Sequence, residues 1–497
     1  MVLKYLYQLV FIGILFLAFC IRYPHLYIQR LWPDEALYSW YAHKIFLDPS
    51  IIFSKEIIEF HPPLFACLLA PGHLFFSKEI ACHLIPFLTN LSGIYLIYRL
   101  GIKIKDQFTG LLAAINLAFN FLYISSSTQI LLDGTLTVFI MLFAGVLLNT
   151  YSVPKNSSSK KQITLGFIGA LILLLKWSGL LIIPLLLVCV GFFLPHLSPL
   201  DRWKKASIPF LILSVTLLFL LVNNLIQLGY VLPDTSALEG KYLIKPPWYY
   251  LFNLHNIRII PYLLPFFIFG LWVIFKKRNP GHLLLMAWFF VFLTGISCTP
   301  EKDLRYSLTL LPSLILISSI GLSTFIDHCS KTQRQKVFIE ILMILILLGS
   351  YGVLYPRTQK FLDRSSVTFI GFKEAGQWIK QETKPDTVIM ASSPRLIRYY
   401  SNIDFQEFGG QIIPLPINRL VFEEISKHAL GSLIVEVDSW EKTCQPSWLY
   451  PVSDKTQQYM KGLGFQLVQV IKKNIYGLEG MKEMRPVIWI FKKYYAL

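Results

Sequence analysis

The stretch LILLLKWSGLLIIPLLLV, residues 171–188, decides how this chain is organised. It is apolar except at Lys176-Trp177-Ser178-Gly179, which interrupt one long apolar run, 162–195. A membrane-spanning helix needs about 20 apolar residues. We therefore predict a tight hairpin of two spans, 162–176 and 178–195, with Lys176 at the turn.

The composition of the whole chain is that of a membrane protein. Of its 497 residues, 54% are hydrophobic and 15% are charged, and the mean hydropathy is +0.54, which excludes an ordinary soluble enzyme. The net charge is +17, but Lys and Arg occur in short clusters between apolar runs, so we expect no nucleic-acid partner. The seven Cys show no CxxC spacing, which predicts neither a disulfide framework nor a zinc site.

Similar apolar runs occur along the first 355 residues, and we predict about eleven spans from them. They are residues 5–22, 81–99, 108–125, 133–150, 162–176, 178–195, 207–227, 259–275, 283–298, 306–325 and 337–355. Alternate loops between these spans are basic, and Lys and Arg are retained on the cytoplasmic side. This pattern places the N-terminus in the cytoplasm and the C-terminus outside, in a cell (plasma) membrane.

Two segments lie outside the predicted spans. The first outer loop, 21–80, contains amphipathic stretches at Glu35 to Phe46 and Leu64 to Phe76 that we expect to form surface helices. Residues 357–497 have the composition of a soluble, non-cytoplasmic α/β domain, which leaves 1–356 as the membrane domain. In the soluble domain we predict strands at Thr387–Ser392, Ser432–Val437 and Phe465–Ile471, and helices at Phe372–Glu382 and Thr456–Leu463.

Three carboxylates are predicted at the outer face of the membrane. Asp34 and Glu35 follow the first span, and Asp133 stands at the mouth of the fourth. Helix capping by Asp34, with Glu35 solvated, is one interpretation. The other is a functional site, because an acid within an apolar segment is costly and faces a cavity or a partner.

Basic groups are expected at the same level. His61 precedes two prolines, while Lys176, Lys302 and Arg305 end apolar runs. A structural role for His61, and snorkelling of the cations to the lipid headgroups, are the simpler interpretations. The alternative is that the cations bind a lipid phosphate, for which Arg offers a bidentate fork and Lys a point charge.

Five motifs occur in order along the chain. They are PDEALY (33–38), HPPL (61–64), LLDG (131–134), LLKWSG (174–179) and LRYSLTLLPSL (304–314). Together they resemble the GT-C membrane glycosyltransferases, in the branch of the dolichyl-phosphate-mannose protein mannosyltransferases and the bacterial aminoarabinose transferase. The resemblance covers residues 1–355 and implies the GT-C fold.

The resemblance also implies an activity. The protein would move a sugar from a polyprenyl-phosphate donor to a hydroxyl of a lipid, glycan or protein of the cell envelope, with inversion. Asp34 would be the general base, with Asp133 orienting the base or acceptor and Glu35 supporting by hydrogen bonds. The residues expected to bind the donor phosphate are His61, Lys176, Lys302, Arg305 and Tyr306. No cofactor or metal is expected, although clustered carboxylates could hold Mg²⁺ or Mn²⁺.

Two other classes of protein remain open from the sequence. A transporter or a flippase for lipid-linked sugars would also have many spans, but we find no internal repeat of the kind common in transporters. An inert assembly protein that acts through its soluble domain is the second alternative. The sugar, the acceptor and the role of the C-terminal domain do not follow from the sequence.

Overall fold

A computed structural model describes most of the chain and divides it into two compact units. The described residues are 2–27, 31–59, 61–75, 78–152, 158–194, 198–231, 245–255, 263–299, 302–366, 368–428, 431–440, 448–449, 451–476 and 482–494. Unit 1 comprises Met1–Tyr27 and Ala42–Thr358, and unit 2 comprises Ile28–Tyr41 and Gln359–Leu497. The start of the first outer loop thus belongs to the same unit as the C-terminal residues.

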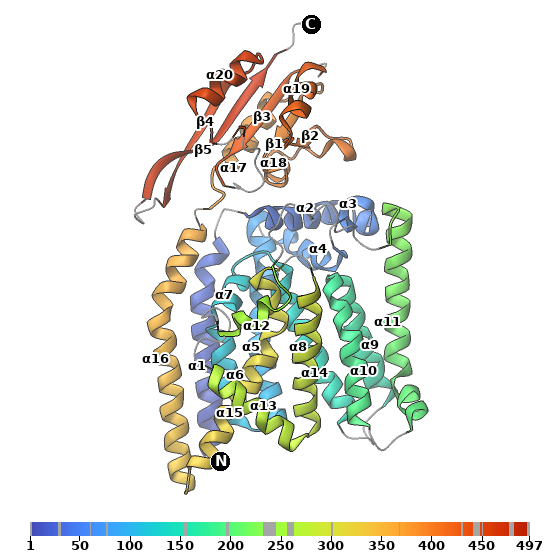
Figure 1. The fold of residues 1–497 in the computed structure, drawn as a ribbon, viewed down its shortest axis with the longest axis vertical. Helices are drawn as coiled ribbons and strands as arrows, with labels where there is room; N and C mark the ends of the chain where they lie inside the picture. Colours follow the sequence, from blue (N-terminus) through green and yellow to red (C-terminus); the bar gives the residue numbers. More distant parts are fainter. Residues whose placement is uncertain are drawn as a thin grey trace. The chain divides into compact units, whose positions relative to one another are not determined.

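Unit 1 is helical throughout its described part (Figure 1). Its long helices are α1 (Val2–Arg22), α5 (Lys78–Ile104), α6 (Gln107–Ala118), α7 (Phe121–Ser127), α8 (Leu132–Tyr151), α9 (Ser159–Leu175), α10 (Ile182–Phe193), α11 (Pro199–Leu228), α13 (Leu264–Lys277), α14 (Pro280–Cys298), α15 (Leu311–Cys329) and α16 (Gln333–Ser366). Short α-helices are α3 (Lys55–Ile58), α4 (Leu64–Leu69) and α12 (Tyr249–Phe252). Helix α2 (Pro33–Leu47) begins in unit 2 and ends in unit 1, and α16 begins in unit 1 and ends in unit 2. Short 3-10 helices include η2 (Pro49–Phe53), η3 (Ala70–Leu74), η5 (Trp177–Leu181) and η8 (Leu304–Thr309).

Seven helices in the described residues are long and apolar enough to cross a membrane, or eight if the bent pair α6 and α7 forms one span. Ten of the expected spans each overlap one of the long helices and 108–125 overlaps both α6 and α7, but α9, α10 and α13 have only 17, 12 and 14 residues. The protein is therefore an integral membrane protein. The number of eleven spans stays a prediction.

The predicted break at Lys176 is confirmed. Helix α9 ends at Leu175, Lys176 is extended (φ −157°, ψ 145°), and η5 leads into α10. A Cβ on Gly179 would lie 2.6 Å from the carbonyl oxygen of Ile172. The chain therefore turns back onto the last turn of α9, and glycine permits that close approach.

The expected continuous span 108–125 is instead broken between α6 and α7, which meet at 63°. The side chain of Asn120 accepts hydrogen bonds from the backbone N–H groups of Leu122 and Tyr123, at 3.0 and 3.2 Å, and so caps α7. The buried Arg22 donates to the carbonyl of Ala118 at the end of α6, at 2.8 Å. These polar partners satisfy the backbone groups that the break releases.

Helices α13 and α15 touch through glycines. A Cβ on Gly321 would lie 2.0 Å from the carbonyl oxygen of Phe266, and one on Gly270 would lie 2.1 Å from that of Ile317. Small residues allow such close backbone contact between membrane helices, where dispersion replaces the hydrophobic effect as the source of association.

Unit 2 contains a five-stranded mixed sheet in the order β2-β1-β3-β5-β4. Its strands are β1 (Val388–Ala391), β2 (Ile412–Pro414), β3 (Leu433–Asp438), β4 (Gln466–Tyr476) and β5 (Lys482–Lys493), and its helices are α17 (Phe372–Glu382), α18 (Pro394–Ser401), α19 (Arg419–His428) and α20 (Asp454–Gly462). Strands β1, β2 and β3 are parallel, while β5 is antiparallel to β3 and β4. The predicted α/β class, three strands and two helices are confirmed, whereas β2, β5, α18 and α19 were not predicted.

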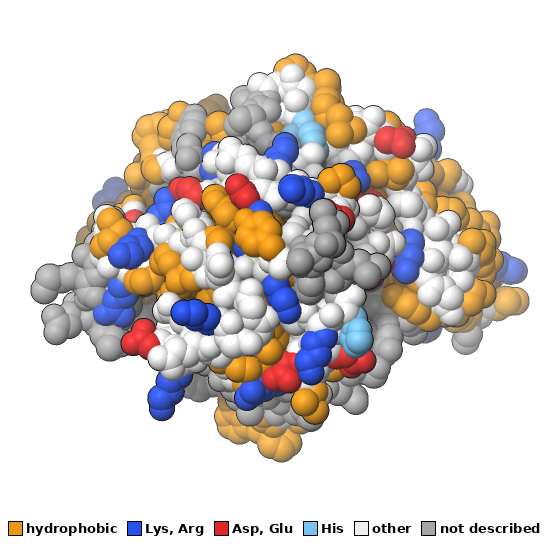
Figure 2. Space-filling model, turned by 90° about the horizontal axis from the view of Figure 1, so that it is seen from above, with side chains coloured by type: hydrophobic (Ala, Val, Ile, Leu, Met, Phe, Trp, Pro, Cys, Tyr) orange, Lys and Arg blue, Asp and Glu red, His pale blue; other side chains and the backbone are white. Residues whose placement is uncertain are grey.

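The core of this sheet domain is apolar. Phe422, Val435, Phe465 and Phe491 are buried in one cluster, together with Met390. On the face shown in Figure 2, Lys and Arg side chains are interspersed with acidic and apolar ones. Such mixing of signs is usual for a solvated surface.

A buried polar cluster lies at the carboxyl ends of β1 and β3. Glu436 Oε2 accepts hydrogen bonds from the backbone N–H and the hydroxyl of Ser392, at 3.0 and 3.1 Å. Asp438 Oδ2 accepts from the hydroxyls of Ser392 and Ser393, at 2.9 and 2.5 Å. Both acids are 0% exposed, so these hydrogen bonds offset the free-energy cost of burying the two acids.

We predict that Gly321→Ala destabilises the membrane unit. The added methyl group must push α13 and α15 apart, and overpacking of this kind costs about 1–3 kcal/mol. Thermal unfolding of the detergent-solubilised protein measures the effect as a lower midpoint. Gly349→Ala in α16 is the control, because a Cβ there meets no described atom within 4 Å, and equal midpoints for the two variants would contradict the close contact.

We also predict that the stability of the sheet domain falls as the pH rises above the usual range of a glutamate. Burial, reinforced by the charge of Asp438, raises the pKa of Glu436 well above its ordinary value. Above about pH 4.3 the unfolded chain has released this proton, and the folded domain still holds it up to the raised pKa. The free energy of unfolding therefore falls progressively as the pH rises from about 4.3 to the raised pKa of Glu436.

Hydrogen exchange of peptides from β1 and β3, corrected for the intrinsic effect of pH, measures this dependence in the whole protein. Glu436→Gln should flatten it, since the amide does not titrate. The same pH dependence in wild type and variant would refute the assignment to Glu436.

Candidate functional site

Asp133 stands in the first turn of α8, where the helix dipole favours an acidic side chain. Its side chain is only 6% exposed. Gly134, the next residue, lets the start of α8 approach its neighbours closely, because a Cβ there would lie 2.8 Å from the side-chain nitrogen of Asn90 in α5. The LLDG motif thus combines the acid with the glycine that lets this part of the helix be buried.

Lys176 is the partner of Asp133. Its ammonium group lies 2.7 Å from Asp133 Oδ1, and its side chain is 13% exposed. The break that ends α9 at Leu175 places this lysine at an extended position outside both flanking helices. The structure therefore brings together two predicted site residues that are 43 positions apart in the sequence.

Tyr306 and Arg305 lie beside this ion pair. The ammonium group of Lys176 is 4.6 Å from the centre of the Tyr306 ring, and the guanidinium carbon of Arg305 is 5.5 Å from it. Both residues belong to η8, whose start is capped by Asp303 Oδ1 through the N–H of Arg305, at 2.9 Å. The electron-rich face of the Tyr306 ring stabilises cations placed over it.

His61 is an electrostatic neighbour of Asp133, as are Lys176 and Arg305. Its two following prolines lead directly into α4. We call the residues Asp133, Lys176, Tyr306, Arg305 and His61 the Asp133 cluster. A buried acid with cations and an aromatic ring around it can bind an anionic group such as a phosphate.

Lys302 makes its described contacts at the end of α14. Its ammonium group donates to the carbonyl of Thr299, the residue that ends α14, at 2.7 Å. Its own carbonyl accepts a hydrogen bond from Lys245, at 2.6 Å. Among the described contacts, Lys302 therefore links a loop to the end of a helix and does not join the Asp133 cluster.

Asp34 and Glu35 lie in the part of α2 that belongs to unit 2. Glu35 Oε2 accepts a hydrogen bond from the backbone N–H of Trp32, at 2.7 Å, and Glu35 is 1% exposed. A glutamate three residues after the N-cap commonly makes this contact. The buried Glu35 thus makes a capping contact, whereas the simpler interpretation had it solvated.

Asp34 forms an ion pair with a residue that sequence reasoning missed. Arg395 Nη1 donates to Asp34 Oδ1 at 2.8 Å, across 361 positions of sequence. Arg395 stands in SSPRL, which matches no motif, and only the fold shows the pairing.

No group of three or more His, Cys, Asp or Glu side chains suited to a metal ion occurs in the described ranges. Asp133 has Lys176 at 2.7 Å and Asp34 has Arg395 at 2.8 Å. Each acid therefore has a protein cation beside it.

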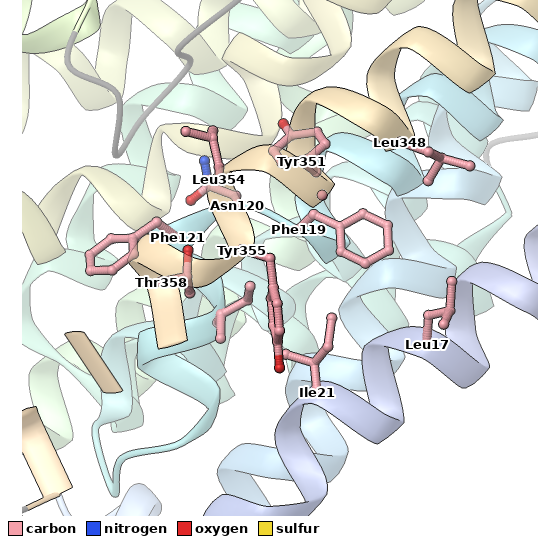
Figure 3. A pocket seen from close by; sticks show the side chains of 12 residues that line it. Leu17, Ile21, Phe119, Asn120, Phe121, Leu348, Tyr351, Leu354, Tyr355 and Thr358 are labelled. Atoms are coloured by element: carbon pink, nitrogen blue, oxygen red, sulfur yellow. The ribbon is translucent and has the colours of Figure 1, made fainter. Parts of the chain in front are cut away.

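An apolar cavity of about 280 Å³ lies elsewhere in unit 1 (Figure 3). It lies between α1, α16 and the break between α6 and α7, and its walls include Leu17, Phe119, Asn120, Tyr351 and Tyr355. The predicted site residues do not line it. The cavity is thus separate from the Asp133 cluster.

Known proteins similar to this chain share its fold. Residues 61–239 match the family model for dolichyl-phosphate-mannose-protein mannosyltransferase, and no curated protein matches the sequence. The crystal structure of ArnT from Cupriavidus metallidurans in the apo state superposes with a TM-score of 0.63 at 13% identity, covering 98% of this chain and 97% of that one.

Two other solved structures extend this likeness. The oligosaccharyltransferase AglB from Archaeoglobus fulgidus has a TM-score of 0.65 at 12% identity, with 97% of this chain and 74% of that chain covered. The arabinofuranosyltransferase AftD from Mycobacteria has a TM-score of 0.58 at 12% identity, with 99% and 40% covered. The chain therefore has the fold of ArnT and AglB, and its residues 61–239 carry the likeness to the mannosyltransferase family model.

Proposed function

We propose that this protein transfers a sugar from a polyprenyl-phosphate donor to an acceptor hydroxyl at the non-cytoplasmic face of the membrane, with inversion at the anomeric carbon. The observation that carries the proposal is the buried Asp133–Lys176 ion pair beside Tyr306 and Arg305, in a chain with the GT-C fold. The acceptor class is a lipid, a glycan or a protein.

The leaving group explains the cations. When the bond between the anomeric carbon and the phosphate oxygen breaks, the electron pair and the negative charge stay on the lipid phosphate. Lys176 and Arg305 stabilise that charge, with His61 assisting, and such preorganised charges are often the largest contribution to catalysis. Asp133 holds the ammonium group of Lys176 in place through the ion pair.

The acceptor needs a base. As its hydroxyl oxygen attacks the anomeric carbon from the side opposite the phosphate, its proton passes to a carboxylate. We assign this role to Asp34, on the basis of the PDEALY motif, while Glu35 fixes the first turn of α2. Attack from the opposite side inverts the anomeric centre.

Structures of similar fold support a lipid-phosphate donor. ArnT from Cupriavidus metallidurans has been solved bound to undecaprenyl phosphate, and AglB from Archaeoglobus fulgidus in complex with an inhibitory peptide and a dolichol-phosphate. The fold and the cation cluster together favour a transferase over the transporter that the span pattern alone left open.

We predict that Asp34→Asn, Asp133→Asn and Lys176→Met each reduce sugar transfer by about 10²–10³-fold, the usual effect of removing a catalytic base or a charge-stabilising group. Mass spectrometry of surface lipids, glycans and proteins from deletion cells carrying each variant measures the product. Lys204→Ala is the matched control, because this lysine is 69% exposed on α11. Wild-type product levels from Asp34→Asn or Asp133→Asn, at equal amounts of protein in the membrane, would refute the mechanism.

We further predict that the sheet domain is accessible from outside the cell. A cysteine introduced as Arg419→Cys, where the arginine is 55% exposed, should react with a membrane-impermeant maleimide in intact cells. Lys204→Cys, on the predicted cytoplasmic side, should react only after permeabilisation, with the parent protein giving the background from native cysteines. The reverse labelling pattern would overturn the predicted orientation.

A further inference from the structure

We propose that the C-terminal domain supplies a positioning residue to the reaction, and that this residue is Arg395, which orients the Asp34 carboxylate. The proposal rests on the assignment of Asp34 as the general base. It gives the domain a role in sugar transfer, although its own sequence contains no catalytic motif.

The first observation is the ion pair itself. Arg395 Nη1 lies 2.8 Å from Asp34 Oδ1, and the two side chains are 24% and 34% exposed. This partial burial weakens solvent screening relative to a pair on the open surface. A carboxylate can accept about four hydrogen bonds, so this contact leaves it the capacity to take a proton from an acceptor hydroxyl.

The second observation is the location of both charges at helix starts. Asp34 in the first turn of α2 is favoured by the helix dipole, whereas Arg395 in the first turn of α18 is opposed by it. The dipole of its own helix therefore does not stabilise an arginine at that position. Its charge is compensated by Asp34, which is the pattern expected when a residue is retained for function rather than local stability.

The third observation is that the same part of α2 is held at two further points. The buried Arg398, one turn along α18, has its guanidinium carbon 4.8 Å from the ring centre of Trp40 and is fixed by Asp404 at 2.6 Å. Trp32 meets Phe369 edge to face at 5.3 Å between ring centres. The segment that carries Asp34 is thus attached to the domain before, at and after the acid.

The fourth observation is that the residues directly before α18, the helix that carries Arg395, are held in place. Ser392 and Ser393, directly before α18, are fixed by Glu436 and Asp438 at the end of β3 through the hydrogen bonds given above. Strand β2 lies on one side of β1 and strand β3 on the other, so the strand order reverses at β1. Open α/β sheets commonly bind ligands at the carboxyl ends of the strands where the order reverses. In this domain that end of the sheet presents Arg395 to another segment of the same chain.

The consequence for catalysis concerns orientation. The ion pair restricts the rotation of the carboxylate, and positioning of reacting groups is a large part of enzymatic rate enhancement.

The test compares Arg395→Ala, Arg395→Lys and the control Arg419→Ala in full-length protein. Arg419 is a second arginine of the same domain whose ion pair, with Glu423 at 2.9 Å, lies on the surface. Initial rates of product formation are measured at neutral pH in proteoliposomes, with the total lipid extract of deletion cells as the source of donor and acceptor.

We expect Arg395→Ala to lower the rate at neutral pH by about 10-fold or more, because the Asp34 carboxylate loses the partner that orients it. Arg395→Lys should recover part of the rate because it keeps the charge. Arg419→Ala should match the wild type.

Two results would overturn the proposal. One is an Arg395→Ala rate equal to that of Arg419→Ala while Asp34→Asn is inactive, which would leave the proposed function standing. The other is a reduced rate with no recovery by Arg395→Lys, which indicates a structural role only. Full activity of Asp34→Asn would instead refute the proposed function, and the role of Arg395 with it.

Discussion

A lysine within an apolar stretch requires an anionic partner, and the ion pair between Lys176 and Asp133 meets that requirement. The two charges are mutually dependent, because an unpaired buried charge costs several kcal/mol. The break between α9 and α10, the start of α8 and the turn η8 are all arranged around this contact. Formation of the ion pair therefore depends on the local backbone geometry of all three segments.

Features that depend on local sequence were predictable. The helix break at Lys176 followed from four residues that interrupt an apolar run, and β1 and β3 followed from short β-branched and apolar stretches. The α6–α7 bend was not predicted, because apolar residues continue through it and Asn120 and Arg22 end the helix by polar contacts that span distant positions. Strand β5 was missed because Pro486 and charged residues at its ends obscure its apolar alternation.

The candidate site shows the same division. The motifs identified Asp133, Lys176, Arg305 and Tyr306, and the structure brings these four together. Lys302 lies within the same motif region, yet its contact with Thr299 depends on where α14 ends, which pattern reading cannot locate to a single residue. The pairing of Asp34 with Arg395 joins opposite ends of the sequence and has no local signature.

The assignment of Ile28–Tyr41 to the same unit as Gln359–Leu497 also affects how the protein is made. During synthesis this early segment must wait while about 320 further residues are added, which takes on the order of 15–60 s at typical elongation rates of 5–20 residues per second. For that time Trp32 and Trp40 lack the aromatic and cationic partners that later cover them. The C-terminal domain thus reaches its complete form only after translation of the chain is nearly finished. A product truncated before this domain would retain the membrane helices, but the segment carrying Asp34 would lack the partners that support it.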